Sequence, residues 1–258
     1  LLQSLAEKNG SSERLSIFAG AGAYEHFIPA AVNAISSRGE FATAYTPYQA
    51  EASQGTLEVI FQYQSMICEL TGLDVSNASL YDGATAAAEA CVLATNTTKK
   101  QEILSAVTVH PEYREVIDTY FKGTGRANRT VPFIKNGDLD RNALESSWNP
   151  NVVGLLVQSP NFFGRVENIE GLSDWVHAHG GLFIVVSHPI AMGYFLSPGE
   201  YGADIACGDL QPLGNPLIYG GPYAGYFTTT STLMRGIPGR ICGETVDTEG
   251  ARAFTLTL

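Results

Sequence analysis

The sequence predicts an α/β fold with a mostly parallel sheet sandwiched by helices. From residue 79 onward, short apolar runs of strand length alternate with helical patterns, which is the order of βαβ units. The run 152–157 is apolar throughout, which is typical of a strand covered on both faces. No linker divides the 258 residues. We therefore expect 1–258 to be a single large-domain fragment of a longer subunit, with a helical and loop segment at 1–78 and the sheet core at 79–258.

The first 78 residues predict helices joined by a loop. Pro29 opens a short helix over 29–37, because proline suits a first helical turn. Apolar residues recur at helical spacing over 56–70, and Gly72 ends that helix. The intervening 41–55 has neither period. It is expected to be an extended loop, with Pro47 keeping Thr46 out of the helical region.

The remaining elements follow from period and length. Strand 79–81 leads through the turn Asp82-Gly83-Ala84-Thr85 into an alanine-rich helix that ends near Ala94. Two more helices are expected at 111–121 and 168–179, and the other strands at 103–109, 152–157, 182–186, 204–207 and 223–229.

The amino-acid composition disfavours several classes of function and partner. A formal net charge of −11 argues against nucleic acid or an anionic membrane as the main partner. Charged residues make up only 16% of the chain, below the roughly 25% of ordinary soluble domains, which hints at surface hidden in a subunit interface. No stretch has the length needed to span a bilayer. The four cysteines form no C-x-x-C pair, which fits buried thiols in a reducing compartment.

Common site motifs are missing. Gly20-Ala-Gly22 has no third glycine and no preceding strand, so it is not a dinucleotide fingerprint. His177 and His179 are two apart on a predicted helix and point to different faces, and the other histidines are scattered. We expect no metal site.

Polar and glycine-rich turns follow successive strands, and they carry the functional signal. Ligands of open α/β sheets gather at the carboxyl ends of strands, so these turns are expected to share one crevice. The first turn offers free amides at a helix N-terminus, and an anion cradle and a simple tight turn are about equally good readings of it. The turns are 81–85, 158–164, 187–189, 209–214 and 219–222.

This order is similar to the large domain of fold-type I pyridoxal-phosphate (PLP) enzymes. The individual sequence motifs resemble those of the glycine-cleavage P-protein family (glycine decarboxylase). Within that family they resemble the amino-terminal half, or α subunit. The motifs span nearly the whole chain: Phe18-Ala-Gly-Ala-Gly-Ala-Tyr-Glu-His26, Tyr45-Thr-Pro-Tyr-Gln49, Gln54-Gly55, Leu80-Tyr-Asp-Gly-Ala-Thr85, Gln211-Pro-Leu-Gly214, Gly220-Gly-Pro222 and Pro238-Gly-Arg-Ile-Cys-Gly-Glu-Thr245.

The resemblance also exposes losses. PLP chemistry needs a lysine that bonds covalently to the cofactor, and by comparison with the catalytic half of the family that position falls at Gln211 and Pro212. The acid that pairs with the cofactor's pyridine nitrogen would fall at Ser187, and the ring-stacking histidine near Thr85. None of the five lysines ends a strand in such a setting. We expect a degenerate cofactor site and no catalytic residue in this chain alone.

The resemblance implies a division of labour. A homologous β subunit would carry PLP on its lysine, in a heterotetramer of two α and two β subunits. The complex would decarboxylate glycine and pass the aminomethyl group to the lipoyl arm of H-protein, in the bacterial cytoplasm. Interface or substrate-channel candidates are Tyr45, Thr46, Tyr48, Gln49 and Gln54, though a packed crossover loop is an equal reading. Gly220 and Gly221 are candidates to contact the partner's PLP phosphate through backbone amides.

Two other functions stay open. The chain could be a stand-alone PLP enzyme with an unrecognised lysine, which the missing strand-end lysine disfavours. It could also be a non-catalytic scaffold subunit, which sequence cannot exclude because a subunit can stabilise its partner without touching substrate.

Overall fold

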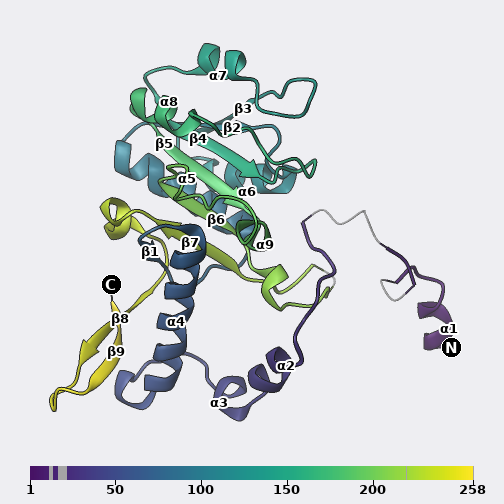
Figure 1. The fold of residues 1–258 in the computed structure, drawn as a ribbon, viewed down its shortest axis with the longest axis vertical. Coiled ribbons are helices and arrows are strands. Elements are labelled where there is room, and N and C mark those ends of the chain that lie inside the picture. Colours follow the sequence, from purple (N-terminus) through teal and green to yellow (C-terminus); the bar gives the residue numbers. More distant parts are fainter. Residues whose placement is uncertain (12–13, 17–21, 219, 258) are drawn as a thin grey trace.

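A twisted sheet forms the centre of the molecule (Figure 1). The computed structural model describes residues 1–11, 14–16, 22–218 and 220–257. Within these residues the main sheet has seven strands in the order β1-β7-β6-β5-β4-β2-β3. The five strands from β6 to β3 run parallel, whereas β7 is antiparallel to both β6 and β1. The strands are β1 (Val75–Ser76), β2 (Glu102–Ala106), β3 (Ala127–Val131), β4 (Val152–Ser159), β5 (Leu182–Ser187), β6 (Ile205–Asp209) and β7 (Gly225–Thr229).

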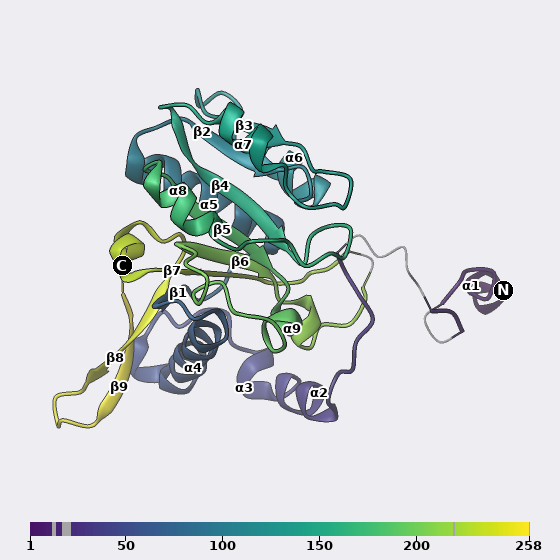
Figure 2. The same cartoon turned by 45° about the horizontal axis from the view of Figure 1, so that its top comes forward.

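Helices cover both faces of the sheet (Figure 2). Successive residues of a strand point to opposite faces. Accordingly, Ile205 and Cys207 of β6 belong to the core cluster that includes α5 (Gly83–Thr98), while Ala206 packs with residues of α4 (Gln54–Thr71). Crossovers between parallel strands are right-handed, so α5 and α6 lie on one face and α7, α8 and α9 on the other. These helices are α6 (Pro111–Phe121), α7 (Arg141–Ser147), α8 (Leu172–Ala178) and α9 (Pro189–Met192), with 3-10 turns η2 (Gln211–Leu213) and η3 (Ser231–Gly236).

The segment before α4 is an arm rather than part of the core. Its helices α1 (Leu2–Ala6), α2 (Ala30–Ser36) and α3 (Gly39–Ala42) contain no buried residue, and the turn η1 (Ala50–Ala52) leads into α4. Figure 1 shows the N-terminal end far to one side of the sheet. Helices without a buried face gain little from packing within this chain.

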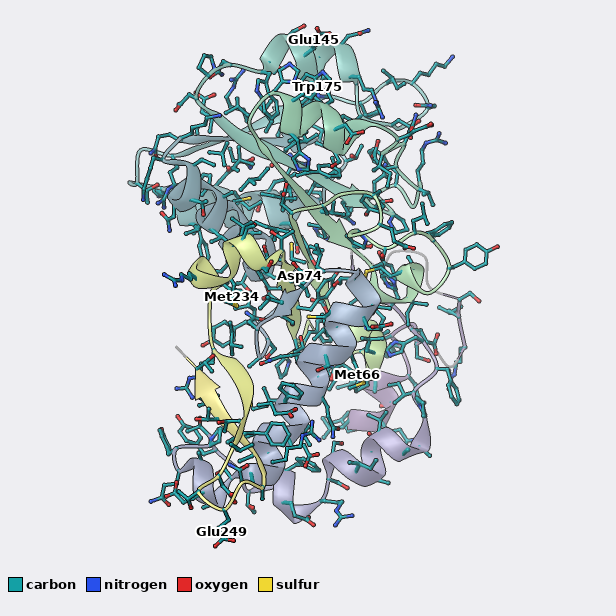
Figure 3. The ribbon with its side chains drawn as sticks, turned by 60° about the vertical axis from the view of Figure 1, so that its left-hand side comes forward. Met66, Asp74, Glu145, Trp175, Met234 and Glu249 are labelled. Carbon is teal, nitrogen blue, oxygen red and sulfur yellow. The ribbon has the colours of Figure 1, made fainter. Side chains whose placement is uncertain are left out.

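A hairpin of β8 (Ile241–Val246) and β9 (Arg252–Thr257) packs on α4 through Leu57, Cys242 and Phe254. Figure 3 shows it beside the N-terminal half of α4, below Met66, with Glu249 near its tip. Two glutamines of α4 bind the outer edges of the hairpin. The Gln54 side chain accepts from the Phe254 N–H and donates to its carbonyl, both at 2.8 Å. Gln64 does the same for Cys242 at 2.8 and 2.9 Å.

Most predicted elements are confirmed. Structure agrees with the helices expected at 29–37, 56–70, 82–94 and 111–121 and with the strands expected at 152–157, 182–186 and 204–207. Gly72 ends α4 in the left-handed conformation, with φ +68°. The two strands predicted at 103–109 and 223–229 are shorter, at 102–106 and 225–229.

Three predictions were wrong in part. Residues 79–81 are not a strand: Ser79 has φ +122°, which turns the chain so that Leu80 makes only a single bridge to Gly225. The helix predicted at 168–179 begins at Leu172, because Gly171 adopts a left-handed conformation in front of it. The loop predicted at 41–55 contains the end of α3 and the turn η1.

Other elements were not predicted. The edge strand β3 has exposed or half-buried residues except Val131, so it lacks an apolar run. The helix α7 and the hairpin β8–β9 were also missed. Among the described residues, no helix is both long and apolar enough to cross a membrane.

Candidate functional site

The carboxyl ends of the central strands open into a cleft made of two adjoining hollows. Their volumes are about 740 Å³ and 510 Å³, and Gly22, His110, Tyr113 and Asp209 line both. The strand-exit turns predicted to share a crevice contribute Gln158, Pro160–Gly164, Ser187, His188, Asp209 and Pro212 to the larger hollow and Asp82, Ala84 and Gly220 to the smaller one. Sequence reasoning thus located the cleft.

N–H groups at the N-terminus of α5 donate hydrogen bonds to carboxylates of the chain itself. Asp82 caps the helix: its side chain accepts from the Thr85 N–H at 2.7 Å, and the Thr85 hydroxyl accepts from the Asp82 N–H. Asp209, at the end of β6, accepts from the Gly83 N–H at 3.2 Å. The Gly83 and Thr85 amides are therefore already bonded within the chain, which favours the tight-turn reading.

Tyr113 closes the same corner. A Cβ at Gly83 would collide with the Tyr113 hydroxyl and with the Asp209 backbone, so only glycine allows this approach. The His110 ring stacks on Tyr113 with centroids 5.0 Å apart. Burial, followed by the charge of Asp209, raises the pKa of the Tyr113 phenol, and burial also raises the pKa of the Asp209 carboxyl. The corner is therefore packed and weakly solvated.

Gln211, at the expected lysine position, is fully buried. Its side-chain oxygen accepts from the Tyr24 N–H at 3.2 Å, and its amide nitrogen donates to the carbonyls of Tyr24 at 3.0 Å and Asn215 at 2.9 Å. Pro212, beside it, lines the larger hollow. The position therefore has a structural hydrogen-bonding role within this chain.

Ser187, at the expected acid position, also lines the larger hollow. It is buried, and its hydroxyl donates to the Ser159 carbonyl at 2.9 Å, while Tyr226 donates to the Ser187 carbonyl at 2.7 Å. A serine hydroxyl has no charge to offer a pyridinium. Next to it, burial and then the nearby His26 lower the pKa of His188, whose ring lies 5.9 Å from that of Tyr24.

The lining of the cleft does not fit PLP. Of the described residues around either hollow, none is a lysine or an arginine, while Asp82, Glu112 and Asp209 bring carboxylates. Anion sites need free N–H groups or cations. A phosphate here would meet negative charge, and the Gly83 and Thr85 amides are already bonded. A covalent bond to PLP needs a lysine, and the described residues around the two hollows supply none.

The Tyr45–Gln54 loop lies elsewhere, since none of its residues lines the cleft. The side chains of Tyr45 and Tyr48 are 90% and 77% exposed, and their rings stand 6.2 Å apart. Arg240 donates to the Thr46 hydroxyl at 3.0 Å, and both residues line a hollow of about 330 Å³. Gln49 is exposed, whereas Gln54 is half-buried and bound to β9.

The loop at 220–222 borders the smaller hollow. Gly220 and Gly221 have φ of +93° and +122°, a region that favours glycine. The Gly221 N–H donates to the Ile218 carbonyl at 2.7 Å, and Gly220 lines this chain's own cleft. Tyr219 and much of the 18–26 motif lie outside the described residues.

Sequence reasoning missed three features of the site: the packing of His110 and Tyr113, the link between Asp209 and Gly83, and the role of Arg240. The carboxylate at the end of β6 and the arginine of the 238–245 motif were visible in the sequence. The partners of these residues could not be identified from sequence, because they are distant along the chain: Thr46 and Arg240 are 194 positions apart.

Comparison with known proteins agrees with this geometry. Residues 1–258 match the family model described as glycine cleavage system P-protein. The chain is 51% identical over 257 residues to the "Probable glycine dehydrogenase (decarboxylating) subunit 1" of Anoxybacillus flavithermus, covering 100% of this chain and 57% of that protein. The protein of the same name from Exiguobacterium sibiricum is 52% identical over 260 residues. The chain thus spans little more than half the length of these relatives.

Solved structures show the same fold. The inhibitor-bound crystal structure of glycine decarboxylase (P-protein) of the glycine cleavage system superposes with a TM-score of 0.92 at 44% identity, over 100% of this chain and 57% of that one. An alanine–glyoxylate aminotransferase from Nostoc sp. superposes with a TM-score of 0.61 at 16% identity, over 88% and 59%. The predicted fold-type I large domain of PLP enzymes is confirmed. The chain belongs to the glycine cleavage system P-protein family.

Proposed function

We propose that this chain is the subunit without the cofactor lysine in a two-subunit, PLP-dependent glycine decarboxylase. The complex decarboxylates glycine and transfers the aminomethyl group to the lipoyl arm of H-protein. The homologous partner subunit holds PLP covalently, and the assembly works in the bacterial cytoplasm. The names of the bacterial relatives and the P-protein fold support this assignment.

One observation carries the proposal. The position where a PLP lysine is expected holds Gln211, which is buried and hydrogen-bonded to the main chain of Tyr24. A glutamine cannot form the covalent bond to the cofactor, and no lysine or arginine is among the described residues that line the adjoining hollows. A family member with this cleft needs a second chain to supply the cofactor.

In this complex the Tyr45–Gln49 loop faces the partner. Two large tyrosine rings are exposed, yet Arg240 holds the loop through Thr46. Aromatic side chains presented on a constrained loop are typical of interface contacts. The loop contributes polar contacts to the substrate channel, and Gln54 supports it by fixing the start of α4 to β9. Gly220 and Gly221 shape a second loop toward the partner's PLP phosphate.

The test is glycine–bicarbonate exchange with H-protein and PLP, for the full-length chain alone and mixed with its lysine-bearing partner. We expect no exchange from the chain alone and full exchange from the mixture. Exchange by the chain alone would favour a stand-alone enzyme and contradict the proposal.

A pair of variants separates an active role from a scaffold. Tyr45→Ala with Tyr48→Ala is expected to lower the exchange rate of the complex at least about tenfold, the effect of losing an interface hot spot. Tyr194→Ala is a matched control, since this side chain is also exposed (86%) and lies on a different part of the chain. Unchanged turnover in the double variant would mean that the chain acts only as a scaffold. Replacing Gly220 with a larger residue should weaken PLP retention by the complex.

A further inference from the structure

A segment of the chain's own N-terminal arm forms part of the cleft lining. We call residues 22–28 the strap. Gly22 lines both hollows, and a Cβ there would approach the His110 ring to 3.2 Å. Tyr24 follows, with its ring against His188 and its main chain on Gln211. Beyond the strap, Val32 of α2 reaches Gly214 in the loop after Gln211, where a Cβ would come within 3.3 Å of it.

Gln211 binds the strap in the way that a neighbouring β-strand would. Its side-chain amide pairs with both the N–H and the carbonyl of Tyr24, at 3.2 and 3.0 Å. The same two-bond pairing fixes Phe254 to Gln54 and Cys242 to Gln64. Of the three glutamines, Gln211 is the most deeply buried, with no exposed surface. Leaving its amide unpaired there would be costly.

We propose that Gln211 is a positioning residue that fixes the strap at the cleft, so that the chain's own N-terminal arm forms part of the cleft lining. The arm continues from Tyr24 through α2 and α3 to the exposed Tyr45–Gln49 loop. By binding Tyr24, Gln211 therefore fixes the position at which the segment leading to the Tyr45–Gln49 loop leaves the cleft. The position of the strap does not depend on the proposed function; only the effect on turnover rests on it.

Hydrogen exchange measures the strap directly. In the full-length protein, Gln211→Leu should speed the exchange of amides in peptides containing Tyr24 about tenfold, the effect of one ordinary hydrogen bond. Gln62→Leu is the matched control, because Gln62 is an exposed glutamine on α4 whose side-chain amide donates to Glu58 at 3.4 Å, far from the strap in sequence. It should leave strap exchange unchanged. Equal strap exchange in Gln211→Leu and the wild type would overturn the proposal.

A second pair of variants avoids the buried site, in case Gln211→Leu does not fold. Tyr24→Pro removes the N–H that Gln211 accepts, whereas Tyr24→Ala removes the same ring and keeps the N–H. We expect the strap amides that follow residue 24 to exchange about tenfold faster in Tyr24→Pro than in Tyr24→Ala. Identical exchange in the two variants would contradict a main-chain anchor.

Turnover distinguishes this inference from the proposed function. In the assembled complex, Tyr24→Pro should lower glycine–bicarbonate exchange relative to Tyr24→Ala. If hydrogen exchange changes as expected but the complex has no glycine activity at all, the proposed function fails and the anchor stands. If activity is normal and strap exchange is unmoved, the anchor fails and the proposed function stands.

Discussion

At the scale of single residues, the missing lysine is not the only difference between this cleft and a PLP site. Restoring that residue with Gln211→Lys leaves Asp209 on the Gly83 amide and Tyr113 over the same corner. We therefore expect no covalent PLP on position 211 after borohydride reduction, checked by peptide mass spectrometry of the full-length protein. A stoichiometric adduct at position 211 would mean that the surrounding residues still form a working cofactor pocket.

His188 gives the cleft a pH dependence. Burial, together with nearby His26, lowers its pKa below the ordinary 6.5, so the folded chain prefers the neutral ring. The neutral His188 ring contributes fully to the free energy of unfolding above about pH 6.5, and this contribution is lost as the pH falls below that value. The free energy of unfolding should therefore decrease more steeply below about pH 6.5 in the wild type than in His188→Gln. Urea titrations at several pH values measure both slopes, and equal slopes would be inconsistent with this origin.

At the scale of elements, α4 links the sheet to the hairpin. The outer edges of β8 and β9 would otherwise leave main-chain groups of Cys242 and Phe254 without partners, and Gln64 and Gln54 satisfy them. Gln54→Leu should lower the free energy of unfolding by about 1–3 kcal/mol, because two backbone groups lose their bonds. Gln62→Leu on the same helix should be close to neutral. Equal unfolding midpoints in denaturant for Gln54→Leu and the wild type would show that water replaces these bonds at no cost.

Elements with a strong local signal could be predicted from sequence, and those fixed by distant partners could not. Strand β4 is apolar on both faces, and α4 has helical periodicity and a glycine stop. By contrast, β3 is an edge strand with polar residues such as Arg129 and Thr130, which give no apolar pattern. That Gln211 stands at the lysine position stays a prediction from the resemblance, and its pairing with Tyr24, 187 positions away, has no local signature.

At the scale of the whole molecule, the chain divides into a packed sheet and an exposed arm. The sheet core is buried on both faces, whereas α1, α2 and α3 contain no fully buried residue. Large apolar side chains remain exposed along the arm, among them Phe27 and Ile35. This division fits a subunit whose arm completes its packing against another chain.

The central claim is that the cofactor belongs to the partner and not to this chain. The most direct measurement is borohydride reduction of the assembled, PLP-loaded enzyme, followed by peptide mapping of both subunits. We expect covalent PLP on the partner subunit alone, with the five lysines of this chain unmodified: Lys8, Lys99, Lys100, Lys122 and Lys135. Stoichiometric PLP on any of these five lysines would contradict it.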